Sequence, residues 1–271
     1  SIIDLTASMA CSVAGSNCGN GIGQCNACGG VWHLPINQSK EAHDLLIDKI
    51  LALRNSQIGI TGYHVSVPTS DSHSLSSDSN SLLTTINGWD AQSLSSQNRR
   101  ICLAIQNAIQ EFQTNAQPNS QRVAIVMSAG SITHECSDVS SGDLNLNGVS
   151  GDAGDDAIQV ACDAKQIYNI TVHAVGFGEN ADQQTLQRIA VCGNGSYYYS
   201  SIPDLVNVYE QIADDIINAT YFEQTIEFSN EVVTTTLYED SLIQFNYSDG
   251  SSLYGLYITT EKKFDNDTAG T

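Results

Sequence analysis

Two predominantly apolar runs constrain the fold of this chain more than any other feature of its sequence. They lie at residues 122–127 (RVAIVM) and 170–177 (ITVHAVGF). Apolar and polar residues alternate in a strand with one solvated face, whereas a strand buried on both faces reads as a continuous apolar run. The two runs therefore predict central strands of a mostly parallel sheet with helices on both of its faces.

The surrounding sequence predicts an α/β domain followed by a β-rich segment. Helical spacing of apolar residues is found at residues 40–53, 78–86, 99–112, 155–167, 182–190 and 203–217, and further strands are predicted at 1–5, 57–67 and 196–199. After about residue 220 only strand patterns follow, at 224–228, 232–238, 242–247 and 253–260. We expect a doubly wound domain over residues 1–220. Residues 221–271 are expected to form part of a β-sandwich-like domain, because they hold too few strands to close a sandwich alone.

Two unusual insertions follow predicted strands of the first domain. One is rich in cysteine and glycine (residues 10–35) and the other is acidic (residues 131–156). Because parallel strands end at the same edge of a sheet, both insertions are expected at the carboxyl edge, where such sheets bind their ligands.

The charge of the chain excludes several classes of partner. The net charge is −20, although only 15% of the residues are charged. An acidic surface argues against nucleic acid, which requires a basic footprint, and against an anionic membrane surface. No apolar stretch approaches the length of a membrane-spanning helix. Other proteins, including further copies of this chain in a filament or oligomer, are the expected partners.

The cysteines indicate an oxidising compartment. Eight cysteines occur, an even number that fits four disulfides: Cys11, Cys18, Cys25, Cys28, Cys102, Cys136, Cys162 and Cys192. Cys102–Cys136 and Cys162–Cys192 are the expected long-range pairs, with two local bridges among the first four cysteines. A zinc site built on those four is the alternative. The six N-x-[ST] sequons add weak support for an extracellular or cell-surface location: Asn37, Asn169, Asn194, Asn218, Asn246 and Asn266.

Residues 143–148 (DLNLNG) match the opening of a calcium-binding loop. In the pattern D-x-[DN]-x-[DN]-G, side-chain oxygens at positions one, three and five point inward, and the seventh residue offers its backbone carbonyl. The expected ligands of a structural Ca²⁺ are Asp143, Asn145, Asn147 and Val149, with Asp155 or Asp156 in place of the usual acid at position twelve. The competing interpretation is a solvated acidic loop held by Asx-turns.

Residues 170–216 resemble the von Willebrand factor A domain. A buried strand ends in V-G-F-G, a helix carries T-L-x-x-I-A, a strand reads G-x-Y-Y-Y, and a last helix carries L-x-x-x-Y-x-x-I-A. The resemblance extends over about residues 1–220 and is strongest to cysteine-containing surface versions from prokaryotes, especially archaea. It implies a Rossmann-like doubly wound fold with a metal-ion-dependent adhesion site, in which D-x-S-x-S, a threonine and an aspartate surround Mg²⁺.

This chain departs from that adhesion-site pattern at two of its three elements. Asp4, Thr6 and Ser8 supply the first element, but Arg99 stands where the threonine is expected and Ala129 where the aspartate is expected. Mg²⁺ is therefore not expected here. One interpretation is that Asp4 and the hydroxyls satisfy loop amides. A second is that the Arg99 guanidinium replaces the cation and pairs with Asp4.

Neither a nucleophile elbow nor a phosphate-binding loop occurs, and the six histidines show no metal-binding spacing. We therefore expect no enzyme. The function that we predict is a structural or adhesion module of a cell-surface protein or filament, such as a pilus or surface-layer subunit. The alternatives are a metal-dependent receptor for an acidic partner residue, bound through Asp4, Thr6 and Ser8, and a secreted hydrolase.

Overall fold

The structure is a computed structural model that describes residues 1–12, 22–31, 33–53, 55–90, 98–118, 120–136 and 140–220, together with four strands nearer the C-terminus. The chain forms two compact units, Ser1–Ala213 and Asp214–Thr271. The helix α7, Leu205–Thr220, continues across this division.

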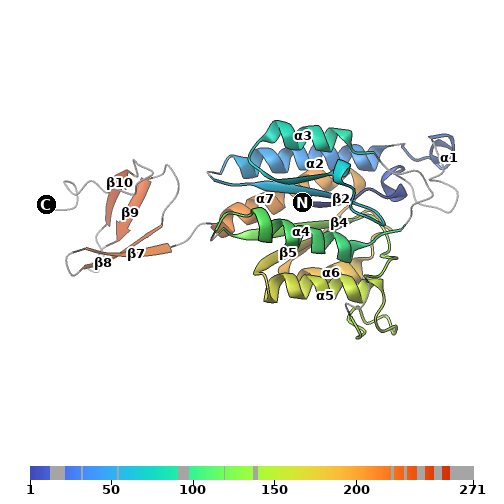
Figure 1. The fold of residues 1–271 in the computed structure, drawn as a ribbon. Coiled ribbons are helices and arrows are strands. Elements are labelled where there is room, and N and C mark those ends of the chain that lie inside the picture. Colours follow the sequence, from blue (N-terminus) through green and yellow to red (C-terminus); the bar gives the residue numbers. More distant parts are fainter. Residues whose placement is uncertain are drawn as a thin grey trace. The chain divides into compact units, whose positions relative to one another are not determined.

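The first unit contains a six-stranded sheet in the order β3-β2-β1-β4-β5-β6 (Figure 1). Its strands are β1 (Ile2–Asp4), β2 (Ile58–Tyr63), β3 (Ser72–Ser76), β4 (Arg122–Ser128), β5 (Ile170–Phe177) and β6 (Asn194–Ser200). All neighbours pair in parallel except β2 and β3, which are antiparallel. The predicted doubly wound, mostly parallel fold is confirmed, and both apolar runs are central strands.

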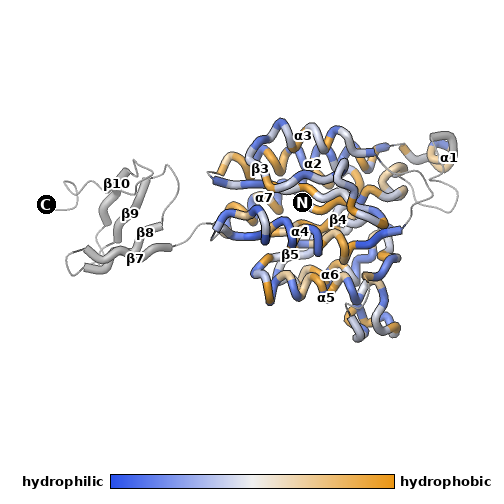
Figure 2. Tube along the Cα trace, viewed as in Figure 1, coloured by the Kyte–Doolittle hydropathy of each residue, from blue (hydrophilic) through white to orange (hydrophobic). Residues whose placement is uncertain are grey.

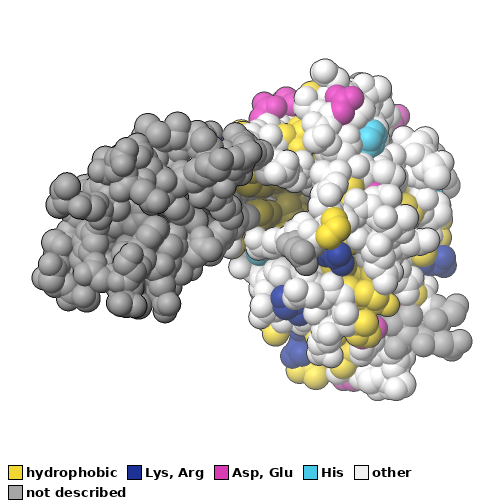
Figure 3. Space-filling view, turned by 60° about the vertical axis from the view of Figure 1, so that its left-hand side comes forward, with side chains coloured by type: hydrophobic (Ala, Val, Ile, Leu, Met, Phe, Trp, Pro, Cys, Tyr) yellow, Lys and Arg dark blue, Asp and Glu magenta, His cyan; other side chains and the backbone are white. Residues whose placement is uncertain are grey.

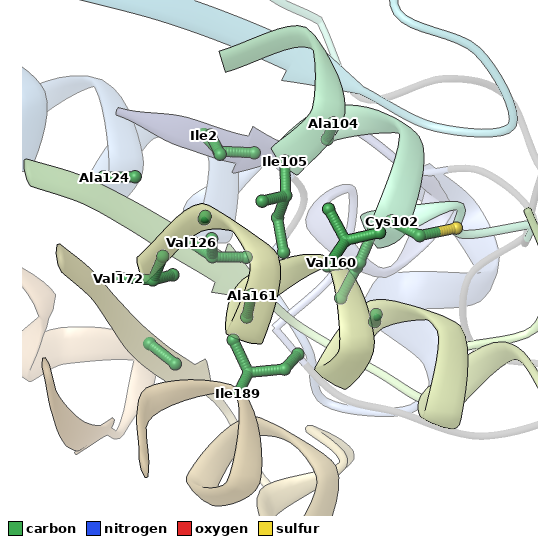
Figure 4. Close-up of a cluster of buried hydrophobic side chains, with 14 of the residues drawn as sticks. Ile2, Cys102, Ala104, Ile105, Ala124, Val126, Val160, Ala161, Val172 and Ile189 are labelled. Carbon is green, nitrogen blue, oxygen red and sulfur yellow. The ribbon is translucent and has the colours of Figure 1, made fainter. Parts of the chain in front are cut away.

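Helices cover both faces of this sheet. The helices α4 (Ile101–Asn115), α5 (Ala153–Gln166) and α6 (Gln183–Cys192) share one buried core with the strands. Figure 4 shows Ile105 of α4 and Ala161 of α5 close to Val126 of β4. Figure 2 shows the apolar residues concentrated in the central strands and on the helix sides that face them.

The helices α2 (Leu34–Leu51) and α7 pack against each other and against the sheet. Lys49 Nζ lies 3.0 Å from Glu210 Oε1, and the rings of His43 and Tyr209 are in contact. The short helix α3 (Ser79–Gly88) begins after Asp78, whose carboxylate accepts hydrogen bonds from the backbone N–H groups of Asn80 and Ser81. Such capping satisfies donors that have no partner within the helix.

The structure differs from the prediction in three elements. The strand β3 (SHSLS) was not predicted because it contains only one apolar residue. The N–H of Leu75 in this strand donates a hydrogen bond to Glu111 Oε1 of α4 at 2.7 Å. The helix α1 (Ile22–Ala27) lies within the cysteine-rich insertion, where no helix was predicted. The helix α2 begins at Leu34, with Pro35 in its first turn, rather than at residue 40; proline is well accommodated there because its missing N–H would have no partner anyway.

The second unit contains an antiparallel sheet of four strands in the order β10-β9-β8-β7. The strands are β7 (Glu223–Phe228), β8 (Glu231–Thr236), β9 (Leu242–Asn246) and β10 (Ser252–Leu256). All four strands that the sequence predicted are present, as the alternation of apolar and polar residues led us to expect.

Candidate functional site at the carboxyl edge

The carboxylate of Asp4 is the centre of the site. Asp4 is the last residue of β1, in the middle of the sheet, and is fully buried. Its Oδ1 accepts a hydrogen bond from the Thr6 N–H at 2.9 Å, and its Oδ2 accepts one from the Ala129 N–H at 3.0 Å. The Ser128 hydroxyl donates to Oδ2 at 3.4 Å. The donors come from the last residue of β4 and from the loops that follow β1 and β4, so two adjacent strand ends share this carboxylate.

Arg99 fills the space beside Asp4. Its Nε donates to Asp4 Oδ2 at 2.7 Å, its Nη1 donates to the Ser131 carbonyl at 3.3 Å, and its Nη2 donates to the Ser8 hydroxyl. Only 6% of the Arg99 surface is exposed. The contact between Arg99 and Asp4 that the sequence suggested is therefore present, and it is a buried ion pair with further hydrogen bonds on both partners.

Gly130 makes room for this guanidinium. A Cβ atom added to Gly130 would lie 2.7 Å from Arg99 Cζ and 2.8 Å from Nη2, closer than side chains can approach. Gly130 is the third residue of the segment in which the resemblance expects T-D-G. Here the glycine allows the guanidinium to lie against the backbone that follows β4.

The environment of Asp4 keeps its carboxyl ionised. Burial by itself would raise the pKa, but the charge of Arg99 and the hydrogen bonds from Thr6 and Ala129 outweigh burial and hold the pKa below its usual value. The folded state therefore contains a carboxylate and a guanidinium that compensate each other away from solvent.

The residues present do not fit the divalent cation that the resemblance implies. A Mg²⁺ ion requires oxygen ligands with near-octahedral geometry, but a cationic side chain occupies the position next to Asp4. That Thr6 and Ser8 bond loop amides stays a prediction. Their hydroxyls lie 3.2 Å apart, and Ser8 also accepts from Arg99. In the part of the chain that the structure describes, no three His, Cys, Asp or Glu side chains are grouped to hold a metal.

The acidic insertion forms a loop around its own carboxylates. Asp143 Oδ1 accepts from the Asn147 N–H at 3.0 Å and Oδ2 from the Gly148 N–H at 3.1 Å. Asn145 Oδ1 accepts from the same Asn147 N–H at 3.1 Å, and Asn147 Oδ1 accepts from the Val149 N–H at 2.7 Å. The side-chain oxygens at positions one, three and five of the DLNLNG pattern thus turn toward the inside of one tight turn.

The two acids expected from the next helix serve the loop backbone. Asp155 is fully buried and accepts from the N–H groups of Leu144, Asn145, Gly151 and Asp152, at 2.6–3.2 Å. Asp156 accepts from the N–H groups of Cys136 and Ser140. Asp152 caps α5 and accepts from the side-chain amides of Asn145 and Asn147. Asp143, Asn145 and Asn147 are therefore brought together, whereas Asp155 and Asp156 are engaged elsewhere in the loop.

Disulfides join segments at both edges of the sheet. Cys102–Cys136 joins the first turn of α4 to the segment after β4, and Cys162–Cys192 joins α5 to α6, so both predicted long-range pairs are present. In the cysteine-rich insertion, Cys11 pairs with Cys25, and Cys28 is also disulfide-bonded. Cys18 lies outside the described residues. Because these cysteines form disulfides, the zinc interpretation of the insertion is wrong.

The sequons at Asn37, Asn169, Asn194 and Asn218 are exposed, while the side chains of Asn246 and Asn266 lie outside the description. Sequence reasoning missed Ser128, Gly130 and Ser131 at the main site. The two serines act on Asp4 and Arg99 through a hydroxyl and a carbonyl, and a lone serine in a loop carries no pattern. Gly130 had a signal, because it follows the apolar run directly and stands where the resemblance expects glycine.

A comparison with known families matches this architecture. A model of the von Willebrand factor type A domain matches residues 34–212, more than half of the chain. The chain belongs to this family. The matched segment begins after Asp4, Thr6 and Ser8, so their assignment to the family's adhesion site rests on β1 and its loop in the structure.

Solved structures share the fold of this von Willebrand A domain at low identity. The vWF domain of a type V pili tip protein from Porphyromonas gingivalis is 14% identical, with a TM-score of 0.57 over 84% of this chain and 97% of that one. The conserved hypothetical protein BatB from Bacteroides thetaiotaomicron is 17% identical, with a TM-score of 0.55 over 80% and 95%. Proximal thread matrix protein 1 from the mussel byssus, with a zinc-occupied MIDAS motif, is 16% identical, with a TM-score of 0.54 over 83% and 48%. No curated protein sequence matches the chain.

Proposed function

We propose that this von Willebrand A domain is an extracellular structural or adhesion module of a cell-surface protein or filament, and that it binds partners without a metal at the family's adhesion site. The observation that carries the proposal is the buried ion pair between Arg99 and Asp4, 2.7 Å apart. A guanidinium cannot exchange ligands as a metal ion does. A partner's carboxylate therefore finds no open coordination position to which it could bind.

The disulfides and exposed sequons support the extracellular part of the proposal. Among relatives in fold, one is a pilus tip protein and another a matrix protein of the mussel byssus, which agrees with a role in adhesion or assembly. No helix in the described ranges is long and apolar enough to cross a membrane. Other proteins are the partners that we propose.

The alternative of a secreted hydrolase would need a serine paired with a histidine, and among the described residues His43 lies near two serine hydroxyls, those of Ser1 and Ser39. The Ser1 hydroxyl lies 2.9 Å from His43 Nε2, and His43 Nδ1 lies 2.7 Å from the Ser39 carbonyl. His43 is buried against Trp89 and Tyr209, and burial lowers its pKa to about 3. A general base must reach its substrate and titrate near the working pH. We therefore propose a non-catalytic module.

Manganese binding tests the proposal, because Mn²⁺ is visible by electron paramagnetic resonance. The wild-type chain is expected to leave the free Mn²⁺ signal unchanged in a titration at neutral pH, since Arg99 occupies the cation position. Excess CaCl₂ in every sample occupies the acidic loop, should that loop bind cations. If the wild type lowers the free Mn²⁺ signal and Asp4→Asn does not, Mn²⁺ binds at Asp4. That result would contradict the proposal and restore the receptor alternative.

The acidic loop is proposed as a structural calcium site in the same module. The oxygens of Asp143, Asn145 and Asn147 already turn into one loop, and Gly148, with φ of 87°, forms the sharp turn that such loops require. The backbone carbonyl of Val149 would be the fourth ligand. We propose that Asp152 supplies a further carboxylate, because its oxygens already accept hydrogen bonds from the side-chain amides of Asn145 and Asn147, two of the expected ligands.

Chelation tests the calcium site. Adding calcium at 100 times its dissociation constant is expected to stabilise the folded state by about 2.7 kcal/mol, through binding to the native state alone. EDTA is expected to reverse this rise in the melting temperature, measured by circular dichroism. Asp143→Asn should abolish the calcium response while Asp78→Asn, which alters a helix cap far along the chain, should keep it. Identical melting with calcium and with EDTA would mean that the loop is a solvated turn.

A further inference from the structure

Cationic side chains without acidic partners lie at the amino edge of the sheet. The strand β4 begins at Arg122, and the helices α5 and α6 end shortly after Lys165 and Arg188. Because α5 and α6 run antiparallel to the strands they cover, these three positions share the edge at which β4 and β5 begin. None of the three forms an ion pair within the described ranges, and Lys165 bonds only the neutral side chains of Asn169 and Thr171. Unpaired cations are unexpected in a chain of net charge −20.

Apolar side chains are exposed at the same place. Ile167, which follows α5, is 66% exposed, and Val191, in the last turn of α6, is 78% exposed. The Cys162–Cys192 disulfide joins these two helix ends. Lys165 follows Cys162 by three residues and Arg188 precedes Cys192 by four, so both lie on the bridged sides of their helices. We call Arg122, Lys165, Ile167, Arg188 and Val191 the basic face.

Figure 3 views the molecule from this side. Dark blue Lys and Arg side chains lie among yellow hydrophobic ones there, and the few magenta acidic groups lie mainly toward the top of the view. The acid closest to Lys165 in the sequence is Asp163, which accepts a hydrogen bond from Gln159 and forms no ion pair with Lys165. A surface that combines cations with exposed apolar groups is suited to an acidic partner that also carries apolar side chains.

The carboxyl edge of the same domain is itself acidic and carries exposed apolar side chains. The acidic insertion follows β4 at the carboxyl edge, and no Lys or Arg occurs between Arg122 and Lys165. Leu146 and Val149 project from it, 60% and 58% exposed. Gln184 of α6 donates to the Asn145 carbonyl at 2.7 Å, which places the loop before α6 against the insertion. We call Glu135, Asp143, Leu146, Val149, Asp152 and Glu179 the acidic tip.

The acidic tip is held in one shape before any partner binds. Asp152 and Asp155 accept hydrogen bonds from both sides of the loop, and Leu146 is fixed at a φ of 60°, a conformation that non-glycine residues seldom adopt. A pre-organised loop loses little conformational entropy on binding. The two exposed apolar side chains are thus presented to a partner rather than folded back onto the domain.

We propose that the basic face of one molecule binds the acidic tip of the next, so that copies of this chain assemble head to tail. The inference rests on the proposed structural role and names its partner as a second copy of the chain. Because the two surfaces lie at opposite edges of one sheet, a bound pair keeps a free basic face and a free acidic tip. Contacts of this heterologous kind extend into open filaments when the rotation between copies does not close a ring.

Sedimentation velocity on the full chain tests the assembly. At low ionic strength and in EDTA, we expect species larger than a dimer whose share grows with protein concentration. EDTA keeps the result independent of the calcium proposal. Because the contact is ionic, about 0.5 M NaCl should disperse these species. A wild type that stays monomeric at low salt over the whole concentration range would overturn the inference and leave the proposed function untouched.

Charge reversal assigns the two surfaces. Lys165→Glu with Arg188→Glu should weaken self-association about tenfold or more, and so should Glu135→Lys with Glu179→Lys, since each places like charges opposite each other. Mixing the two double variants should restore assembly, because every contact then pairs opposite charges. Leu146→Asn with Val149→Ser removes the apolar part of the tip, with asparagine suited to a positive φ, and should also weaken assembly.

Two results would overturn the assignment: self-association that either charge-reversed variant retains unchanged, or a mixture that remains monomeric although both variants give wild-type circular dichroism spectra. The Mn²⁺ titration keeps the two proposals separable. Metal bound at Asp4 contradicts the proposed function whatever the state of assembly, whereas a failed charge swap contradicts only the head-to-tail contact.

Discussion

Replacing Arg99 by alanine is expected to lower the free energy of unfolding at neutral pH by about 3–5 kcal/mol, the range found when one partner of a buried ion pair is removed. The substitution leaves the Asp4 carboxylate buried with no cation beside it. Three hydrogen bonds from Thr6, Ser128 and Ala129 remain, but they do not neutralise its charge. Urea denaturation followed by circular dichroism measures the loss.

The pH dependence of this loss follows from the pKa of Asp4. In the wild type the folded-state pKa lies below the unfolded value, so the stabilisation is present above the unfolded pKa and disappears as pH falls through the folded pKa. In Arg99→Ala, burial acts without the guanidinium and raises the pKa of Asp4. The stability difference between wild type and variant is therefore expected to be largest near pH 7 and to shrink toward pH 4.

Lys49→Ala is the matched control for the buried pair. It removes the ion pair with Glu210, in which the two side chains are 27% and 48% exposed. An exposed pair of this kind is worth less than about 1 kcal/mol. Adding Asp4→Asn to Arg99→Ala should recover part of the lost stability, because the buried charge is then gone. Equal losses for Arg99→Ala and Lys49→Ala would contradict the assignment of Arg99 as the internal cation.

Removal of the Cys102–Cys136 disulfide is the second large effect that we expect. The bridge closes a separation of 34 residues, for which chain entropy predicts a loss of roughly 3–4 kcal/mol. The bridge also fixes the segment whose Ser131 carbonyl accepts from Arg99. Alanine is the proper replacement at both positions, since Cys102 and Cys136 are 0% and 8% exposed.

Urea denaturation of Cys102→Ala/Cys136→Ala measures this loss, and mass spectrometry after thiol blocking establishes that the remaining cysteines stay oxidised. The disulfide Cys11–Cys25 closes only 14 residues and lies in another loop. Its removal by alanine at both positions should cost less and should leave the pH dependence of stability unchanged. A loss below about 1 kcal/mol for the Cys102–Cys136 variant would show that the native fold gains nothing from this closure.

Much of the fold could be predicted because a strand that is buried on both faces contains few polar residues. The runs in β4 and β5 contain almost no polar residues, and burial on both faces is the simplest physical account of such segments. The strand β3 has no such pattern, since its backbone pairs with β2 while four of its five residues are only half-buried. The helix α1 could not be predicted either, because glycine, asparagine and cysteine dominate the insertion that contains it and leave no helical spacing of apolar residues.

The main site was predictable in its side chains and not in its backbone. Arg99 and Asp4 were paired because a charge that replaces a metal ligand needs a counter-charge in a buried place. The Ala129 N–H and the Ser131 carbonyl complete the pair, but every residue except proline has an N–H and every residue a carbonyl, so sequence cannot single these out. The same limit explains why the backbone amides held by Asp155 and Asp156 could not be predicted, while calcium binding by these two residues stays a prediction.

Asp155 makes the shape of the acidic loop a property of the helix that follows it. Four N–H groups from both arms of the loop converge on this one carboxylate, which belongs to the first turn of α5. The loop and the first turn of α5 thus form one folding unit, because a residue of the helix fixes the conformation of the loop backbone. Residues 140–156 could be transplanted together onto another parallel sheet with their shape intact, whereas residues 140–151 alone would lose it.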